Sequence, residues 1–439
     1  MSNGKYFFSH DSARLLRIIL RLMFGGFLHF DIISVSKEAS MSAGNLSSDI
    51  AGRIETLHRL GERLAAQRRA LIMAAGEDTG TPCTAAAMEV DLAVDHLLSM
   101  ADDLPFVQGK VPYGTVAAIF PYDAAPVMLA RVGGSSLLGG NRFRFSCSSQ
   151  TPRTAEVIRE VVAPFPEIEM VTGMDNKEFG RRAVADPAVR VLFISGGGEV
   201  GAIYEAQAAH FDKVFFAGPS GLPPAIVFRD ASPVAAATFV VRRAFLNGGQ
   251  YCTTIKRVYI HQDIYQKVKQ AILELMPEIK VGDPRDPETW IGPIKVERTR
   301  HLLDRALAAL DHPRFLWEYR REGEWQGPFL VEVPDPPDLE LFGPFLALVP
   351  VRSDAEAVAR VQKSRYPFLV AWFGTPPAGG REILTATFGM IYDNPDFLFT
   401  PLRLPFGGKG ESGWIIENRE GVLLKRDGAF NYSAELVRS

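Results

Sequence analysis

The sequence has few cysteines, almost no net charge and no long uncharged apolar run. Its 439 residues include three cysteines, Cys83, Cys147 and Cys252. They are odd in number and far apart, so we expect no disulfide framework. We expect the protein in a reducing compartment, the cytoplasm. There are 48 Lys and Arg residues against 51 Asp and Glu residues, which gives a net charge of −3. That balance argues against a nucleic-acid partner, which would need a basic excess.

Metal-binding patterns and sequence repeats are also missing. The sequence contains no CxxC, no Cys/His cluster and no HExxH, and its eight histidines are scattered, so no metal is expected. No repeat of solenoid period and no low-complexity tract is visible. The composition, 47% hydrophobic and 23% charged, excludes global disorder. The length exceeds what one core usually serves, so two or more domains are expected.

The N-terminal region is apolar but carries charges. Residues 15–33 are interrupted by Arg17, Arg21 and Asp31, whereas a spanning helix needs about 20 residues with few or no charges. No small-residue cleavage site follows. A membrane partner is therefore not expected, while a surface helix or a packing element stays open. We treat residues 1–43 as an N-terminal extension.

The next part of the sequence alternates between helix-like and strand-like segments. A helix is expected from Ser48, with Ser48 or Asp49 as its N-cap, and a second over about 84–102. The strands and helices that follow predict a parallel sheet covered on both faces, which binds ligands at the carboxyl ends of its strands. The expected strands are 115–120, 142–145, 167–171, 190–194, 213–216 and 225–228, and the expected helices are 151–162, 177–184 and 199–209.

A second α/β segment is expected between about residues 233 and 415. Its pattern again alternates strands with helices. The last residues, 429–439, are predicted to form a terminal strand. The expected strands are 257–260, 345–351 and 367–373, and the expected helices are 262–276 and 295–310.

One cysteine lies in a pattern that suggests chemistry. Residues 245–257 read F-x-N-x-G-Q-x-C-x-x-x-x-R, with Cys252 as the cysteine. The two glycines before it allow a tight turn and a close approach to a ligand. Backbone N–H groups at the loop end can stabilise a thiolate or an oxyanion. A thiolate can form a covalent thiohemiacetal or thioester. The alternative is a buried, inert cysteine, the usual state of a lone cysteine.

A glycine-rich turn follows one expected strand and opens the next helix. It runs Ser195-Gly196-Gly197-Gly198-Glu199-Val200-Gly201. Backbone amides and the helix dipole can hold a phosphate in this setting. Ser195, Gly196, Gly197 and Gly201 are therefore candidate cofactor residues. The alternative is a tight turn without a ligand, because the G-x-G-x-x-G match alone is weak.

The stretch around Cys252 resembles the nucleophile motif of the aldehyde dehydrogenase superfamily, and the resemblance covers roughly residues 44–439. Other motifs of that superfamily follow in compatible order, including E-x-F-G-P at Glu340–Pro344. The remaining matches are Gly140-Asn141, Thr151-Pro152, Gly282–Pro284, Ile291–Pro293, Asn394, Pro405–Gly408 and Ser412-Gly413.

The resemblance implies an α/β fold with a Rossmann-like, parallel-sheet cofactor domain and an α/β catalytic domain. We assign the NAD(P)-binding domain to 44–231, the catalytic domain to 232–415 and a C-terminal segment to 416–439. The implied function is an NAD- or NADP-dependent oxidoreductase that acts on an aldehyde through a thiohemiacetal and thioester on Cys252.

The resemblance also implies a set of cofactor-binding positions. Glu340 would hold the nicotinamide ribose, with Phe342 from the same motif beside it. Pro121 and Tyr122 stand in the family's P-W-N segment, and Ser146 in its K-P-S-E segment. The Lys and Glu of that second segment are missing. Arg142 and Arg144 on the preceding strand could bind a 2′-phosphate, so both cofactors stay open.

Two departures concern catalysis itself. No Glu occurs between Glu205 and Glu274, so the family's usual base for releasing the acyl group is missing. The family's Asn is Asp123 here. An ionised Asp cannot donate to an oxyanion and would oppose a nearby thiolate, but Asp123 could act when protonated or serve as a base.

Three functions are therefore weighed. In the first, water is the acyl acceptor and the product is an acid. The second uses CoA or another thiol as acyl acceptor, or runs backward as an acyl-thioester reductase. The third is a non-catalytic binding or scaffold subunit. Because the hairpin that family members use for assembly is missing before residue 115, a homo-oligomer would have an altered interface.

Overall fold

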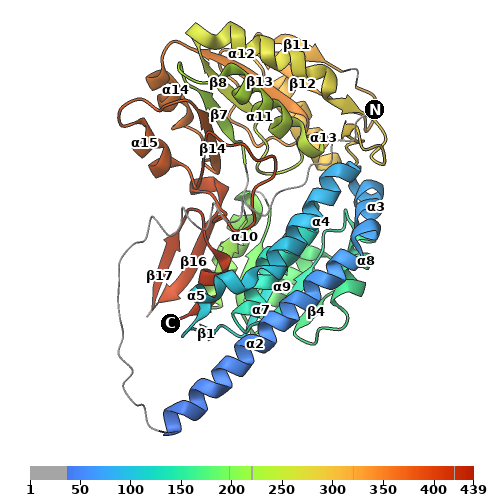
Figure 1. Ribbon diagram of the computed structural model, residues 1–439, viewed down its shortest axis with the longest axis vertical. Helices are drawn as coiled ribbons and strands as arrows, with labels where there is room; N and C mark the ends of the chain where they lie inside the picture. The colour runs from blue at the N-terminus through green and yellow to red at the C-terminus, as the bar shows by residue number, and fades with distance from the viewer. Residues whose placement is uncertain (1–36, 197, 219–220, 320, 420) are drawn as a thin grey trace, which may run out of the picture. The chain divides into compact units, whose positions relative to one another are not determined.

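The computed structural model describes residues 37–196, 198–218, 221–319, 321–419 and 421–439, without the side chains of 37–49 and 198–199. The chain divides into two compact units, Met1–Asp49 and Ile50–Ser439, and the second holds both sheets (Figure 1). The apolar run at 15–33 lies outside the described residues. No helix of the described part is long and apolar enough to cross a membrane.

Three helices of 12 or more residues precede the first sheet in the described chain. They are α2 (Lys37–Ala66), α3 (Arg68–Thr79) and α4 (Cys83–Leu98). The second expected helix is confirmed by α4. The N-cap prediction at Ser48 or Asp49 is wrong, because both residues lie inside α2. The preceding residues include Ala, Glu, Lys and Met and no proline, so nothing in them stops the helix.

The first sheet contains the expected parallel strands. Its strand order is β17-β16-β6-β5-β2-β3-β4, and only β16 and β17 run antiparallel to their neighbours. Every residue of β2 is buried, as in a sheet covered on both faces. The strands are β2 (Thr115–Ile119), β3 (Arg142–Ser146), β4 (Ile168–Met170), β5 (Val189–Ile194), β6 (Val214–Ala217), β16 (Trp414–Arg419) and β17 (Val422–Arg426). The connecting helices are α8 (Pro152–Val162), α9 (Asn176–Ala185) and α10 (Gly198–His210).

The second sheet has the order β11-β12-β13-β8-β7-β14-β15, with only β11 antiparallel. Figure 1 shows it with α12, α14 and α15 around it. The strands are β7 (Pro224–Val227), β8 (Arg257–His261), β11 (Arg314–Glu318), β12 (Phe329–Glu332), β13 (Phe345–Val351), β14 (Leu369–Phe373) and β15 (Met390–Asp393). The helices are α11 (Pro233–Phe245), α12 (Gln262–Leu275), α13 (Glu297–Ala308), α14 (Asp354–Val361) and α15 (Gly380–Thr387).

The domain limits from the sequence stay an interpretation, but two strands fall on unexpected sides of them. Strand β7 precedes residue 232, yet it pairs with β8 and β14 of the second sheet. Strand β16 begins before residue 416 and pairs with β6 of the first sheet. The chain therefore crosses to the second sheet before 231 and returns to the first near 414.

The terminal strand predicted over 429–439 is wrong for most of its length. Residues Tyr432–Glu435 form the short helix α16, and only Val437–Arg438 (β18) pair, with β1 (Val111–Pro112). The side chain of Asn431 accepts a hydrogen bond from the backbone N–H of Ala434 at 3.3 Å. An Asn N-cap of this kind starts a helical turn instead of extending a strand.

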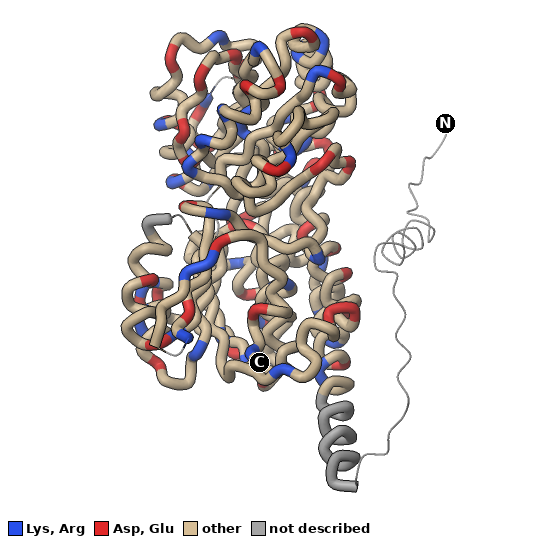
Figure 2. Tube along the Cα trace, turned by 90° about the vertical axis from the view of Figure 1, so that its left-hand side faces the viewer, with Lys and Arg blue, Asp and Glu red and all other residues tan. Residues whose placement is uncertain are grey.

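Charged residues of both signs are interspersed along the described chain. Figure 2 shows Lys and Arg positions intermixed with Asp and Glu positions along the described trace. The interior is apolar, and the rings of Phe120, Phe143 and Phe145 stack with centroids 4.7 and 5.3 Å apart. These aromatic rings anchor the ends of β2 and β3 next to the loop that carries Asp123.

Candidate active site

One large cavity of about 850 Å³ lies at the carboxyl ends of β2 and β5. This is where a parallel sheet is expected to bind a ligand. Most of the predicted site residues line it, from both halves of the sequence. They are Cys252, Asp123, Glu340, Phe342, Ser195, Gly196, Pro121 and Tyr122.

The backbone before Cys252 is tightly coiled. The 3₁₀ turn Leu246–Gly249 contains three consecutive residues with positive φ: Asn247 at 51°, Gly248 at 58° and Gly249 at 70°. A Cβ on Gly249 would overlap the carbonyl oxygen of Gly343. Glycine is therefore needed there for two reasons, the left-handed conformation and the close approach of the E-x-F-G-P loop.

Two buried cations hold the nucleophile loop in place. The Lys256 Nζ donates to the carbonyl oxygens of Gly249 at 2.7 Å and Gly343 at 2.6 Å. Arg243 donates from Nε to the Thr253 carbonyl at 3.0 Å and from Nη2 to Thr400 Oγ1 at 2.7 Å. It also donates to the Leu398 carbonyl. Burial lowers the pKa of both side chains.

The Cys252 thiol is partly exposed and lines the cavity. Burial, followed by the negative charge of Asp123, raises its pKa to about 12, against the opposing effects of Arg131, Arg243 and its own backbone N–H. At neutral pH the resting group is therefore a thiol. A nucleophilic role requires a base that takes its proton.

Asp123 has the properties of that base. Burial raises the pKa of its carboxyl to about 7. The described carboxylates that line the cavity are Asp123, Glu297 and Glu340. Glu297 is largely exposed beside His301, and Glu340 pairs with Arg298 at 3.4 Å. Asp123 forms no ion pair within the described residues.

The backbone after Asp123 is strained. Ala124 adopts a left-handed conformation, with φ 56° and ψ 36°, directly before helix α6 (Ala125–Met128). Such a conformation costs a non-glycine residue of order 1 kcal/mol and often marks functional sites. Here it turns the chain between the end of β2 and the helix, at the cavity wall.

A second buried acid lies behind the nucleophile. Glu89 on α4 accepts a hydrogen bond from the Tyr251 hydroxyl, and both side chains are buried. Burial raises the pKa of Glu89 to about 8 and that of Tyr251 well above its usual value. Sequence reasoning missed Glu89. The available signal was one acid among the apolar residues of A-A-A-M-E-V.

Only part of the predicted phosphate turn faces the cavity. Ser195 and Gly196 line it, and Gly197 lies outside the described residues. Gly201 does not line it, because a Cβ there would overlap Trp414. Ser146 also lies elsewhere, with its hydroxyl donating to Asn176 Oδ1 at 2.7 Å. Neither residue is part of the cavity lining, and the cofactor role expected of them stays a prediction.

The remaining cofactor candidates come from two other segments, one after β2 and one before β13. Glu340 and Phe342 line the cavity, as do Pro121 and Tyr122. The Tyr122 hydroxyl shares a hydrogen bond of 2.9 Å with Thr299 Oγ1 on α13. Burial raises the pKa of Tyr122, so its hydroxyl stays protonated.

The two arginines suggested for a 2′-phosphate lie away from the cavity. Arg144 forms ion pairs of 2.7 Å with Glu169 and Asp186, and Arg142 lines a different, smaller cavity with it. Both project from β3, and Arg142 stands at its amino end, whereas ligands bind at the carboxyl ends of the strands. Helix α9 places two cations, Lys177 and Arg181, in the lining of the main cavity.

The segment that usually supplies the family's general base approaches the nucleophile closely. A Cβ on Gly221 would overlap the Cys252 carbonyl oxygen, and one on Gly218 would overlap Ile194 and Ser195. Glycine at these two positions therefore allows close backbone packing, in a segment whose sequence contains no Glu.

The residues present fit a dinucleotide. The cavity extends from Cys252 and Glu340 past Ser195 to α9 and α10, and its volume suits a ligand of that size. Within the described part of the chain, no group of three or more His, Cys, Asp or Glu side chains could hold a metal.

Two parallel-sheet halves, a thiol and a dinucleotide-sized cavity between them define a cysteine-dependent nicotinamide oxidoreductase. The sequence pattern of the Aldehyde dehydrogenase family matches residues 31–425. The chain belongs to the aldehyde dehydrogenase family, and it is an NAD(P)-dependent, aldehyde dehydrogenase-like oxidoreductase. The fold expected from the sequence is confirmed.

Relatives and solved structures agree with this assignment. N-succinylglutamate 5-semialdehyde dehydrogenase of Novosphingobium aromaticivorans is 27% identical and covers 83% of each chain. D-glyceraldehyde dehydrogenase (NADP(+)) of Picrophilus torridus is 32% identical over 65% of this chain and 62% of its own. An oxidoreductase from Marinobacter aquaeolei has the same fold, with a TM-score of 0.78, 23% identity and coverage of 89% and 85%.

Proposed function

We propose that the protein oxidises an aldehyde to the acid, with Cys252 as nucleophile and Asp123 as the base for both half-reactions. The observation that carries this proposal is Asp123 itself, an unpaired carboxylate of raised pKa in the cavity wall near the thiol. In this proposal Asp123 takes over the roles of two residues of the family. One is the Asn whose position Asp123 occupies, and the other is the missing Glu.

In the first half-reaction the Cys252 sulfur attacks the aldehyde carbon. Ionised Asp123 takes the thiol proton, which matters because burial keeps the pKa of the thiol near 12. The proton then goes to the carbonyl oxygen, and the product is a thiohemiacetal. The backbone N–H of Cys252 can donate to the developing oxyanion, as the family's Asn would.

In the second half-reaction the thioester on Cys252 is hydrolysed. Before the hydrolysis, Asp123 takes the proton of the thiohemiacetal hydroxyl as the carbon gives up its hydride, and it releases that proton to solvent. Ionised again, Asp123 takes a proton from the attacking water and passes it to the Cys252 sulfur, which leaves as the thiol. A carboxylate with a pKa near 7 is suited to accept and return protons at neutral pH.

The cofactor would be held by groups from both halves of the chain. Ser195 and Gly196 would contact its phosphates, and Glu340 its nicotinamide ribose. When bound, NAD or NADP accepts a hydride from the aldehyde carbon. Lys177 and Arg181 favour NADP, because they supply positive charge on α9 where an extra phosphate could bind.

A thiol acceptor such as CoA is the second candidate. It is favoured by the lack of a Glu between Glu205 and Glu274 and by the close approach of the Gly221 backbone to Cys252. In that reaction a thiolate attacks the thioester, so no water has to be activated.

A stopped-flow record of nicotinamide absorbance would separate these candidates. The enzyme would be mixed with aldehydes and each of NAD and NADP, with and without CoA. Steady turnover without CoA, with a rate that rises with pH up to about pH 7, supports Asp123-assisted hydrolysis. A burst near one equivalent, followed by turnover only with CoA, supports the thiol acceptor. Cofactor binding with no burst for any aldehyde would favour a non-catalytic subunit and contradict both.

The assembly state belongs to the proposal as well. β1 pairs with β18 of the same chain, and only residues 108–114 separate α5 (Leu104–Val107) from β2. We expect a homo-oligomer with an interface other than the family's hairpin, and light scattering of the purified protein would show its size.

A further inference from the structure

Arg131 is a buried cation that faces the main cavity without an acceptor. It is 5% exposed and lines the cavity that contains Cys252 and Asp123. Its Nε has no hydrogen-bond partner, and no carboxylate of the described residues lies within ion-pair distance of it. Buried guanidinium groups are normally paired, because an unpaired charge pays the full cost of leaving water.

The local backbone places this side chain in the cavity wall. Arg131 lies on η2 (Leu129–Gly134), a π-helical stretch between α6 and α7 (Ser135–Leu138). Such bulges are uncommon and occur often at functional sites, because they turn side chains away from the regular helical direction. The two glycines that end the stretch allow its close contact, since a Cβ on Gly133 would overlap Phe143 and one on Gly134 would overlap Met100.

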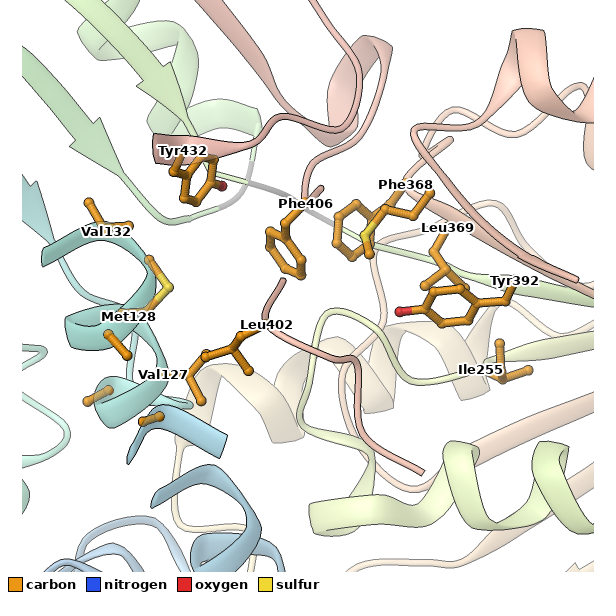
Figure 3. Packing of buried hydrophobic residues seen from close by; sticks show 14 of the residues in the cluster. Val127, Met128, Val132, Ile255, Phe368, Leu369, Tyr392, Leu402, Phe406 and Tyr432 are labelled. Atoms are coloured by element: carbon orange, nitrogen blue, oxygen red, sulfur yellow. The ribbon is translucent and has the colours of Figure 1, made fainter. Parts of the chain in front are cut away.

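The surroundings of Arg131 are aromatic. Its guanidinium lies 4.1 Å from the centre of the Phe406 ring. Figure 3 shows Phe406 in the packed cluster between Val132 and Phe368, and the Phe368 and Phe406 rings are 5.3 Å apart. The hydroxyl of Tyr392 is already hydrogen-bonded to Thr400. A cation–π contact fixes the plane of the guanidinium but leaves its N–H groups available.

The main cavity is where a ligand larger than water can contact Arg131. The other void that Arg131 lines, with His96 and Asp103, has a volume of only about 10 Å³. A void of that size holds at most one water. Arg243 shows what a structural arginine looks like in the same region, because its Nε, Nη1 and Nη2 all donate to protein acceptors.

We infer that Arg131 binds an anionic group of the substrate, so that the preferred aldehydes carry a carboxylate, sulfonate or phosphate on a short chain. This inference rests on the proposed aldehyde oxidation and adds the substrate class. The aldehyde carbon lies at Cys252 and the anion at Arg131. The apolar side chains of Met128, Phe399 and Phe406 line the space that an aliphatic chain would cross.

The first test compares two aldehydes of similar shape. Succinic semialdehyde carries a carboxylate, and 4-methylpentanal carries a neutral branched end. The wild type should prefer the semialdehyde in kcat/KM, and Arg131→Met should reduce that preference by about 30-fold or more. Arg142→Met, which removes an exposed arginine outside the cavity, should keep the wild-type ratio. Sulfoacetaldehyde and glyceraldehyde 3-phosphate in the same assay tell the anionic groups apart.

Equal losses for both aldehydes in Arg131→Met would overturn the inference, because they would mean that Arg131 acts on the thiolate. A wild type without preference for the anionic aldehyde would overturn it too. Arg131→Lys guards against loss of folding. It keeps the charge without the planar guanidinium, and its ratio should fall between those of the wild type and Arg131→Met.

A binding measurement separates this inference from the proposed oxidation. Succinate would be titrated into Cys252→Ala in a calorimeter, with and without the additional Arg131→Met change. Binding that weakens about 30-fold with the second change supports the anion site even if the wild type oxidises no aldehyde. Equal binding by both variants contradicts the anion site while leaving the oxidation untouched.

Discussion

The two walls of the cavity differ in how their charges are matched. The nucleophile loop, 246–256, is held by Lys256 and Arg243, and each guanidinium nitrogen of Arg243 donates to a protein acceptor. The opposite wall, 121–134, presents Asp123 and Arg131, and neither has an ion-pair partner among the described residues. The first wall is built for rigidity. In the second wall, the proposed roles of the unpaired charges are to bind the substrate and to transfer protons.

The largest expected effect is the loss of the nucleophile. Cys252→Ala should lower kcat by about 10⁴-fold or more, because no second thiol lines the cavity in the described residues. The variant should still bind NADP, as measured by fluorescence. Cys147→Ala is a matched control, since burial raises the pKa of Cys147 to about 12 as well, but outside the cavity. Unchanged turnover in Cys252→Ala would mean that the chemistry lies elsewhere.

The next effect concerns the unpaired acid of the second wall. Asp123→Asn should lower steady turnover about 10²- to 10³-fold, the usual contribution of a general base. Because the base form is ionised Asp, wild-type kcat/KM should rise about tenfold per pH unit below pH 7 and level off above it. The variant should lose this limb. A limb that survives in Asp123→Asn, in a pH profile recorded from 5 to 9, would assign the titration to another group.

Sequence patterns predicted the nucleophile loop, 246–256, better than the wall formed by residues 121–134. The glycines before Cys252, the E-x-F-G-P loop and the parallel strands are local signals of turns and periodicity. Arg131 could not be found in this way, because its unpaired state depends on a π-helical stretch and on Phe406, which lies 275 positions further along the chain. Glu89 was missed for the same reason, since its partner Tyr251 comes from a distant loop.

A third variant tests whether the nucleophile loop is held for stability alone. Lys256→Met leaves the Gly343 carbonyl without its cation, and we expect the free energy of unfolding to fall by about 2–3 kcal/mol. Lys213→Met is the matched control, because Lys213 Nζ donates to two carbonyls far from the cavity, at 2.8 and 2.6 Å. Both should unfold at lower urea concentration. Only Lys256→Met should also lower kcat, and equal kcat in the two would reduce Lys256 to a structural role.

The buried acid behind the nucleophile predicts a pH-dependent stability. Burial raises the pKa of Glu89 from 4.5 to about 8, so the folded protein holds a proton that the unfolded chain releases. Its contribution is present below pH 4.5 and is lost as the pH rises toward 8, at about 1.4 kcal/mol per pH unit. Glu89→Gln should therefore flatten the curve of unfolding free energy from pH 5 to 8. Parallel curves for both proteins would place the proton elsewhere.

The smallest effect should appear at the exposed cations of α9. Replacing Lys177 and Arg181 with Ala should raise the KM for NADP about 3- to 10-fold and leave the KM for NAD nearly unchanged, because solvent-exposed charges contribute little each. Arg182→Ala is the control on the same helix, since Arg181 and Arg182 both pair with Glu178 but Arg182 does not line the cavity. High salt should shrink the difference. An equal rise in the KM for both cofactors would mean that these cations serve the shared diphosphate and leave cofactor choice to other residues.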